Sequence, residues 1–535
     1  MDKQTFERNL LALSKSDPSL CTRLSSAITT AGTYRFLQAR SGETIPALTD
    51  SDGAAHPLHS TVDPRREAAR LISTLADEGY LLFLGLGGAF AAEAALERET
   101  SRKILIIEYD LNGIAELLSS KDYIKLLQDY RVTLLCDPSP EQLEAFILRN
   151  YIPAIDGGIR VIPLRVRADA DIRFSTAADT VKNVIEAVSR DYSVQAYFGK
   201  RWFCNIIRNL SLAESQNRRI APVRKAVICA AGPSLEEQIP FIKKEKTVNN
   251  SDSNFLIAAD TSLPALLHAG IEPDAVISID CQHISYRHFF GLLPEKTILF
   301  LDLASPPPVA SRTENRIFFS GGHPLSLFIS RTWRPLPVLD TSGANVTYAA
   351  LSLAENLGAK ELTLFGADFS YPRGKTYARG TYIYPYFENI QSRCIPLEAR
   401  HSAFLYRDSS LEKINNQQDP WYYETKSLKF YREKAREKEK IITEKRSREL
   451  SLFSSGTLHQ SARDFLKDYR AAVTKLVFFD PVRQDEVSAT LLPLAAFFRR
   501  LNPAYTSSDL FAAVKSCCLK ELDNIIEAAK IINQN

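Results

Sequence analysis

A short turn near the middle of the chain has the residue types that hold phosphate groups. Residues 230–234 read AAGPS and lie at the end of the apolar run KAVICA. Gly232 allows the backbone to approach a ligand closely, and Pro233 and Ser234 suit the start of a helix. A helix start at the carboxyl end of a parallel strand presents amide groups and a partial positive charge to an anion. The turn therefore predicts a nucleotide-phosphate site, with a well-capped structural turn as the alternative.

Aspartates recur at one kind of position, because Asp260, Asp280 and Asp368 each follow an apolar strand-like run. Ligands of open α/β sheets bind outside the carboxyl ends of the strands, so these carboxylates are expected at a ligand-binding edge. Carboxylates there can hold sugar hydroxyls, bind a metal ion or act as a base. Asp280, Asp368 and the nearby His283 are the catalytic candidates, and Asp260 and Asp368 are expected ligand contacts. The alternative role for each aspartate is that of a helix N-cap.

A second turn of small residues, DTSGAN at 340–345, also follows a strand-like run and precedes a helical pattern. Hydroxyl side chains and glycine suit an anion-binding turn at a helix start. Thr341, Ser342 and Gly343 are therefore predicted to contact the same nucleotide. A plain helix N-cap explains the pattern equally well.

The first part of the chain contains a weaker nucleotide signal. Gly85 and Gly87 follow the apolar run YLLFLG, and Glu108 ends the next run, KILIIE. A glycine turn followed by an acid at the end of the next strand is typical of phosphate and ribose binding. The fingerprint is incomplete, because Ala91 stands where the spaced glycine would fall. These three residues are a possible second nucleotide site, and a closely packed structural turn is the alternative.

The elements that must position these residues alternate between strands and helices. Most of the strand-like runs are apolar throughout, which is typical of parallel strands covered on both faces. In the central region they are KAVICA, NFLIAAD, AVISID, TILFLDL, NRIFFS and ELTLFGAD. Helical patterns lie between several of them, and two of these patterns end in glycine. The alternation predicts a doubly wound, Rossmann-like α/β domain.

Three domains are expected, because the pattern of strand-like, helical and charged segments changes twice along the 535 residues. Residues 1–220 form an amino-terminal domain with a Rossmann-like βαβ part, carried by YLLFLG, KILIIEYD and RVTLLCD. Residues 221–405 form the central nucleotide-binding domain. Residues 406–535 form a helical domain, in which no strand signal is found from Trp421 onward.

Composition and charge exclude several classes of protein. A net charge of +3 gives the chain no strong attraction for nucleic acid or membranes. The 8 cysteines form no CxxC pair, which argues against a zinc site or a disulfide framework. The amino terminus lacks an apolar signal segment, and no apolar run is long enough to span a membrane. A cytoplasmic protein without a metal site is therefore expected.

These motifs together resemble the motility accessory factor (Maf) family. The resemblance is carried by AAGPSLEEQIP, by the stretch IAADTSLPALLHAGIEPDAVISID, and by TSGANVTYAALSLAENLGAKELTLFGADFSYPRGKTYARG. GLGGAF and IIEYD resemble the amino-terminal domain of the same family. The resemblance covers more than half of the chain. The central part is also similar to 6-hydroxymethylpterin diphosphokinase (MptE-like) proteins.

The resemblance implies a glycosyltransferase needed for flagellar assembly and motility. It would move a nonulosonic, sialic-acid-like sugar from a CMP-activated donor to serine or threonine of flagellin, without a required cofactor. Gly232, Pro233 and Ser234 would then lie by the donor nucleotide, and Ser342 and Gly343 would form a second donor turn. Family members often carry histidine where this chain has Tyr377, so the catalytic base is left open.

Two other functions remain open at this point. An MptE-like enzyme would transfer diphosphate from ATP to a hydroxymethylated pterin, with Mg²⁺ held by the aspartates at the strand ends. A catalytically silent protein would bind flagellin and assist its assembly. The large flanking domains are poorly explained by a small-molecule kinase, and the retained glycine turns argue against a silent protein.

Overall fold

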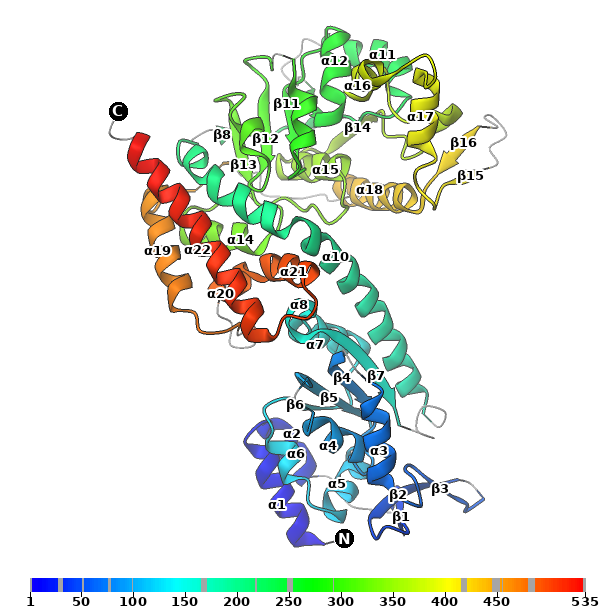
Figure 1. Cartoon of the computed structure of the whole chain (residues 1–535). Helices are drawn as coiled ribbons and strands as arrows, with labels where there is room; N and C mark the ends of the chain where they lie inside the picture. The colour runs from blue at the N-terminus through cyan, green and yellow to red at the C-terminus, as the bar shows by residue number, and fades with distance from the viewer. Residues whose placement is uncertain are drawn as a thin grey trace. The chain divides into compact units, whose positions relative to one another are not determined.

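The structure is a computed structural model, and Figure 1 shows the whole chain. It describes residues 2–26, 32–50, 52–75, 78–98, 100–164, 171–216, 219–247, 254–291, 293–414, 421–444, 453–454, 456–479 and 486–532. The chain divides into two compact units. Unit 1 comprises residues 1–197 and 499–507, and unit 2 comprises residues 198–498 and 508–535. The helix α10 (Ile172–Glu214) runs from the first unit into the second.

Unit 1 is built on a parallel four-stranded sheet with the order β6-β5-β4-β7. Its strands are β4 (Glu78–Leu84), β5 (Lys103–Glu108), β6 (Val132–Cys136) and β7 (Gly158–Pro163). The first three confirm the predicted strands. The fourth was not predicted, because its mostly exposed or half-buried residues lack a continuous apolar run. A separate antiparallel sheet joins β1 (Tyr34–Gln38), β2 (Thr44–Thr49) and β3 (Ala55–Pro57).

Both faces of the parallel sheet in unit 1 are covered, which explains its apolar strands. Leu81 and Phe83 belong to one buried cluster, while Leu82 and Leu84 belong to another. The second cluster includes Phe174 of α10. The remaining helices of the unit are α1 (Lys3–Ser14), α2 (Pro18–Ser25), α3 (Pro64–Ser73), α4 (Phe90–Leu96), α5 (Leu111–Ser120), α6 (Ile124–Gln128), α7 (Pro140–Asn150) and α8 (Pro153–Asp156).

Unit 2 contains a fully parallel six-stranded sheet with the order β13-β12-β11-β10-β9-β14. The strands are β9 (Lys225–Cys229), β10 (Phe255–Ala259), β11 (Ala275–Ser278), β12 (Ile298–Asp302), β13 (Arg316–Phe319) and β14 (Glu361–Phe365). All six had been predicted as buried strands. The chain proceeds outward from β9 to β13 and then returns to place β14 beside β9. The strand order therefore reverses between β9 and β14, where ligands of such sheets bind.

Helices cover both faces of this sheet, as predicted for a doubly wound domain. In Figure 1, α15 (Val346–Asn356) and α18 (Lys426–Glu444) lie on the side opposite α11 (Leu235–Thr247) and α12 (Leu263–His268). Residues of α15 and α18 share a buried core with the strands. Gly270 and Gly358 follow α12 and α15 with φ of 73° and 85°. Both confirm the predicted glycine at a helix end, where a left-handed residue satisfies terminal carbonyls.

The remaining helices of unit 2 lie in both its central and its carboxy-terminal parts. They are α13 (Pro307–Ala310), α14 (Pro324–Thr332), α16 (Ile383–Ile390), α17 (Leu397–Leu405), α19 (Ala462–Lys475), α20 (Glu486–Thr490), α21 (Leu492–Leu501) and α22 (Ser507–Ile532), with the 3₁₀ turns η1 (Asp260–Ser262), η2 (His283–Phe289) and η3 (Pro372–Gly374). No described helix is long and apolar enough to cross a membrane.

Short strands interrupt the region that was expected to be helical. β15 (Glu412–Ile414) pairs with β16 (Tyr422–Glu424), and β17 (Phe453–Ser454) pairs with β8 (Arg219–Ile220). The expectation of no strand from Trp421 onward is therefore wrong. Pieces of two or three residues are too short to create an alternating pattern that a sequence could reveal. The boundaries expected at residues 220 and 405 stay a prediction.

An ion-pair network fixes α18 on the central sheet domain. Lys438 of α18 lies 2.7 Å from Glu355 of α15 and 3.2 Å from Asp340. The side chains of Lys438 and Glu355 are only 10% and 9% exposed. Burying these charges is tolerable because each has an oppositely charged partner.

Replacing Lys438 with methionine should therefore destabilise unit 2. Removal of one member of a buried ion pair costs about 3 kcal/mol, because the buried Glu355 carboxylate would lose this counter-charge. Urea unfolding followed by fluorescence measures this loss. Lys440→Met is the matched control, since Lys440 lies on the same helix and is 72% exposed. Its expected effect is within about 0.5 kcal/mol. Equal stability of both variants and the wild type would contradict the assigned role.

Candidate functional site

The loops after β9 and β14 meet where the strand order reverses. The Gly232 amide donates a 2.8 Å hydrogen bond to the Gly366 carbonyl. A Cβ atom at Gly232 would overlap the Asp368 carboxylate and the Gly366 carbonyl oxygen. Gly366 has a φ of 64°, and its own Cβ would overlap the Ala230 carbonyl oxygen. Glycine is thus required at both positions so that the two loops can touch.

Asp368 closes the start of α11. The backbone amide and hydroxyl of Ser234 both donate to Asp368 Oδ2 at 3.0 Å. The next two amides donate to the carbonyls of Gly232 and Pro233. Burial raises the pKa of Asp368, and the Ser234 hydrogen bonds oppose this shift. The helix start that was predicted to hold a phosphate therefore already carries a carboxylate of the protein.

The segment after β14 folds back over this turn. Glu236 of α11 accepts a hydrogen bond of 2.6 Å from Lys375 Nζ and another from the Arg379 amide. The Ala378 amide donates to the Ala231 carbonyl at 3.0 Å. These contacts place Tyr377, the residue at the expected histidine position, in the same loop. Its pKa is raised mainly by burial, so the phenol remains protonated at neutral pH.

Asp260 and Asp280 form an acidic pair at the ends of β10 and β11. Asp260 is buried and accepts a 2.6 Å hydrogen bond from Ser278 Oγ and another from the Thr261 amide. Asp280 is half-buried and accepts one hydrogen bond of 2.8 Å from the Gln282 amide. Burial raises the pKa of Asp280, and the negative charge of Asp260 raises it further. Asp280 is thus a carboxylate whose affinity for a proton is increased.

Histidines near the strand ends occupy different environments. His283 begins η2 and is exposed. His323 Nε2 lies 3.6 Å from an Asp302 oxygen, and its ring centroid lies 4.4 Å from that of Trp202. Asp302 is buried, and its pKa is raised by burial against the charge of His323. Sequence reasoning missed Asp302 as a candidate, although it ends the run TILFLD in the same way as the predicted aspartates.

The turn before α15 is arranged around Asp340. Asp340 accepts hydrogen bonds from the Ser342 hydroxyl at 2.6 Å and from the Tyr348 hydroxyl at 2.7 Å. Burial would raise the pKa of Asp340, but these bonds and that from Lys438 outweigh it and hold the pKa well below its usual range. Gly343 lies so close to the Tyr348 ring that a Cβ atom would overlap it. Ser342 itself is exposed.

Asn345, and not Ser342, caps α15. Its side chain accepts a hydrogen bond from the Tyr348 amide. The Val346 and Thr347 amides have no hydrogen-bond partner among the described residues, as expected for the first turn of a helix. Thr341 Oγ1 donates to the Gly321 carbonyl at 2.9 Å, which ties this turn to the loop after β13.

The structure brings the predicted residues together in two groups and leaves the rest apart. Ser234 contacts Asp368, and Asp260 influences Asp280 electrostatically. Within the described residues, no hydrogen bond or ion pair joins Thr341, Ser342 or Gly343 to either group. None of these contacts tests a ligand, so the assignment of these residues to a donor nucleotide stays a prediction. The described residues also include no group of three His, Cys, Asp or Glu side chains that could hold a metal ion.

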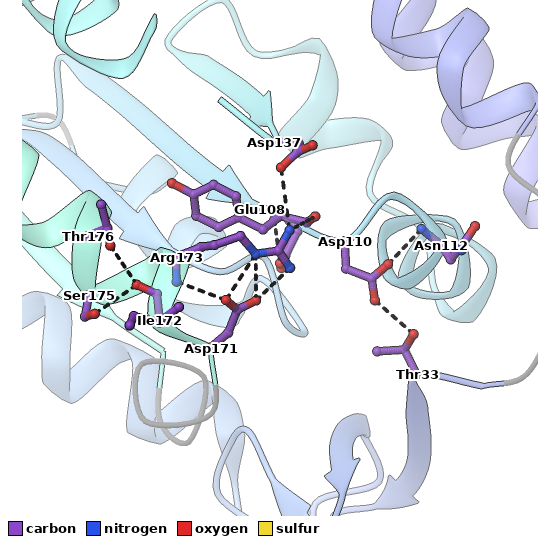
Figure 2. Close-up of polar contacts among 11 residues, drawn as sticks. Thr33, Glu108, Asp110, Asn112, Asp137, Asp171, Ile172, Arg173, Ser175 and Thr176 are labelled. Carbon is purple, nitrogen blue, oxygen red and sulfur yellow. Dashed lines mark hydrogen bonds and ion pairs between the residues drawn. The ribbon is translucent and has the colours of Figure 1, made fainter. Parts of the chain in front are cut away.

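In the possible second nucleotide site of unit 1, Glu108 accepts hydrogen bonds from the protein's own backbone. Glu108 is fully buried and accepts hydrogen bonds of 3.1 Å from the Leu86 and Tyr109 amides. Figure 2 shows Glu108 beside Arg173, which pairs with Asp171 at 2.8 Å and lies 3.6 Å from Asp137. Glu108 thus holds the glycine turn in place, and an arginine covers this end of the sheet.

A cavity of about 310 Å³ borders that turn and is lined by Gly85, Leu86 and His59 among others. Gly85 and Gly87 have positive φ values of 108° and 49°. The Gly88 amide donates to His59 Nε2 at 2.8 Å. Burial lowers the pKa of His59 to about 4, and the charge of Lys121 adds to this. A neutral imidazole therefore supports the turn, and the positive φ values and the close approach of Leu164 already favour glycine at 85 and 87. The assignment of Gly85, Gly87 and Glu108 to a nucleotide stays a prediction.

Comparisons with known proteins bear on both the central region and the whole fold. Residues 200–374 match the family described as "6-hydroxymethylpterin diphosphokinase MptE-like". An uncharacterized protein of Treponema pallidum (strain Nichols) is 30% identical over 180 residues, which is 33% of this chain and 83% of that protein. Another uncharacterized protein of the same organism is 46% identical over 91 residues. That match spans 17% of this chain and only 32% of the relative's length.

The solved structure of a Maf glycosyltransferase from Magnetospirillum magneticum AMB-1 is similar over nearly the whole chain. The match covers 98% of this chain and 95% of the other, with a TM-score of 0.59 and 14% identity. It confirms the resemblance in fold, including the Rossmann-like parts. The chain therefore belongs to the same family as the 30% identical Treponema pallidum protein, contains an MptE-like central region, and has the fold of a Maf glycosyltransferase.

Proposed function

We propose that the protein is a glycosyltransferase that moves a nonulosonic acid from a CMP-activated donor to serine or threonine hydroxyls of flagellin in the cytoplasm, before export. The observation that supports it most is the carboxyl edge of the central sheet, where Asp260, Asp280 and Asp368 follow β10, β11 and β14. The Maf glycosyltransferase fold extends over 98% of the chain. The proposal therefore accounts for the flanking regions as well as for the site.

The donor phosphate is best accommodated at the start of α15. The start of α11 already binds the Asp368 carboxylate, and a second anion at the same amides would be repelled by it. The Val346 and Thr347 amides of α15 have no partner among the described residues, the helix adds a partial positive charge there, and the nearby Asp340 carboxylate is already paired with Lys438 at 3.2 Å. In this arrangement Thr341, Ser342 and Gly343 line the phosphate, while Gly232, Pro233 and Ser234 form the wall of the nucleotide cleft.

The reaction is a displacement at the anomeric carbon of the donor sugar. The oxygen of the acceptor hydroxyl forms a bond to this carbon, and the bond from the carbon to the phosphate oxygen breaks. CMP leaves with the electron pair, and the proton of the acceptor passes to Asp280. Asp280 suits this role because it is half-buried, one of its oxygens is held by the Gln282 amide, and its pKa is raised.

A second candidate function follows from the match of residues 200–374 to the MptE-like family. The chain would then transfer diphosphate from ATP to a hydroxymethylated pterin and would require Mg²⁺. Magnesium-dependent consumption of ATP in the presence of 6-hydroxymethylpterin would favour this function. The glycosyltransferase remains the leading proposal, because diphosphate transfer to a small pterin gives no role to the parts of the chain outside residues 200–374.

Flagellin from cells that lack this protein should be lighter by the mass of one or more nonulosonic acids. Intact-mass spectrometry of purified flagellin measures the difference, and complementation with the wild-type gene should restore it. An unchanged flagellin mass would remove the proposed activity. If motility were lost at the same time, a non-catalytic role in flagellin assembly would explain the phenotype.

Binding of CMP to the purified protein should depend on the turn before α15. Ser342 is exposed, so Ser342→Tyr should fold normally while its ring fills the phosphate position, and we expect affinity to fall at least about tenfold. Isothermal titration calorimetry measures the change. Ser311→Tyr is the matched control, because Ser311 is also an exposed serine of unit 2. Equal loss of affinity in both variants, or in neither, would argue against this position.

Asp280→Asn should lower the catalytic rate and at the same time raise the thermal stability of the protein. Loss of a general base should lower kcat about 100-fold or more. Because burial raises the folded-state pKa, the ionised carboxylate destabilises the fold above that pKa. The variant should therefore melt about 2 °C higher at neutral pH. This gain should shrink as the pH falls through the raised pKa and vanish below 3.8, the usual pKa of the group, where Asp280 is protonated in both states. Unchanged kcat would exclude Asp280 as the base.

A further inference from the structure

Unit 2 contains a cavity whose lining includes none of the site residues predicted from the sequence. Its volume is about 560 Å³, which is within the range of small-molecule sites. The walls are formed by α12, by η2, by α16 and by the segment that leads into α16. All of these elements follow the carboxyl ends of β10, β11 and β14. The cavity therefore opens on the same side of the sheet as the proposed donor site.

Arg287 provides this cavity with a positive charge that the protein itself does not fully use. The Nη1 atom of Arg287 is buried and has no hydrogen-bond partner among the described residues. Its guanidinium lies 4.2 Å from the ring centroid of Tyr386, which fixes the plane of the group. A buried donor without a partner costs free energy, so such a group is usually completed by a ligand or by water.

His288 lies beside Arg287 and has a similar deficit. Its Nδ1 atom is buried and lacks a partner within the described part of the chain. The His288 ring packs edge-on against Tyr382, with 4.7 Å between the centroids. Arg287 and His288 both line this cavity, and each has a buried nitrogen atom without a partner among the described residues. An anion with more than one oxygen atom could accept hydrogen bonds from both.

The rest of the cavity is mainly apolar. Leu263 and Leu267 of α12 face it, together with Phe289 and Leu293 from the β11–β12 connection. Tyr386 is partly exposed at its wall. Aromatic and aliphatic surfaces of this kind pack against the C–H face of a pyranose ring or an acyl group. The lining therefore fits a ring-sized ligand with one anionic group. It does not fit a ligand that carries charged groups on all sides.

Electrostatic neighbours connect the cavity to the candidate site. The pKa of Tyr382 is raised mainly by burial, and the charges of Arg407, Arg287, Asp260 and Asp280 all act on this phenol. Asp260 and Asp280 would repel a phosphate with two negative charges more strongly than a carboxylate with one. The two carboxylates offset the charges of Arg287 and Arg407, which disfavours a phosphate more than a monoanion.

We propose that this cavity binds the sugar ring of the donor and that Arg287 and His288 hold the carboxylate on that ring. This inference rests on the proposed function, since it identifies where the sugar part of the same donor lies. Arg287 would form a two-pronged contact with the carboxylate, which orients the anomeric carbon toward Asp280. Arg287 is thus a specificity residue, which selects an acidic sugar over a neutral one.

The test compares N-acetylneuraminic acid with its methyl ester as probes of the full-length protein. Saturation-transfer NMR at millimolar ligand should show binding of the acid, with the ester at least about tenfold weaker because it has lost the charge. Arg287→Met should weaken binding of the acid by a similar factor and leave binding of the ester unchanged. Arg287→Lys should give an intermediate affinity, since it keeps the charge but not the planar fork.

Arg393→Met is the control, because this exposed arginine lies just beyond α16 and outside the cavity lining. This substitution removes the same charge, and the variant should bind the acid with the affinity of the wild type. Equal binding of acid and ester by the wild type, or an equal effect of Arg287→Met and Arg393→Met, would overturn the inference. CMP affinity measured on the same samples separates the two proposals. If CMP binds and the acid does not, only this inference fails; if CMP does not bind, the donor site itself is wrong.

Discussion

The contact between the Ser234 turn and Asp368 is the constraint on which the central site depends. Neighbouring loops diverge to opposite faces of a sheet where its strand order reverses, and that divergence creates a crevice. Here the crevice is closed at its base by two hydrogen bonds from Ser234 to one carboxylate oxygen. Only glycine at 232 and 366 allows the loops to approach so closely. The conformation of the edge is thus set by the protein before any ligand arrives.

That constraint also determines the charge that a ligand meets. Asp260, Asp280 and Asp368 all lie at the carboxyl edge, and burial raises the pKa of the last two. An anionic ligand can bind near such a group only where positive charge or free amides compensate. The first turn of α15 and the guanidinium of Arg287 are two such sources in the described structure.

Much of the fold could be predicted because its strands are buried on both faces. Runs such as AVISI and TILFL are apolar throughout, and glycines at 270 and 358 mark helix ends. The strand β7 and the short pairs after Trp421 could not be predicted, since they are too exposed or too short to form a pattern. Local sequence also indicated that Gly232 and the aspartates lie at strand ends, which the sheet confirms.

The chemistry of the site was harder to predict, because it depends on contacts between distant segments. A helix start after a glycine turn looks open to phosphate, but the anion at α11 comes from Asp368, which lies 134 residues away. Arg287 is one of many charged residues in the sequence, and only the fold leaves its Nη1 atom buried without a partner. The same reasoning applies to Glu108, which has the position of a ribose ligand yet holds its own turn. A motif therefore indicates where a ligand-binding edge lies, while the contacts of each polar atom decide which groups remain free to bind.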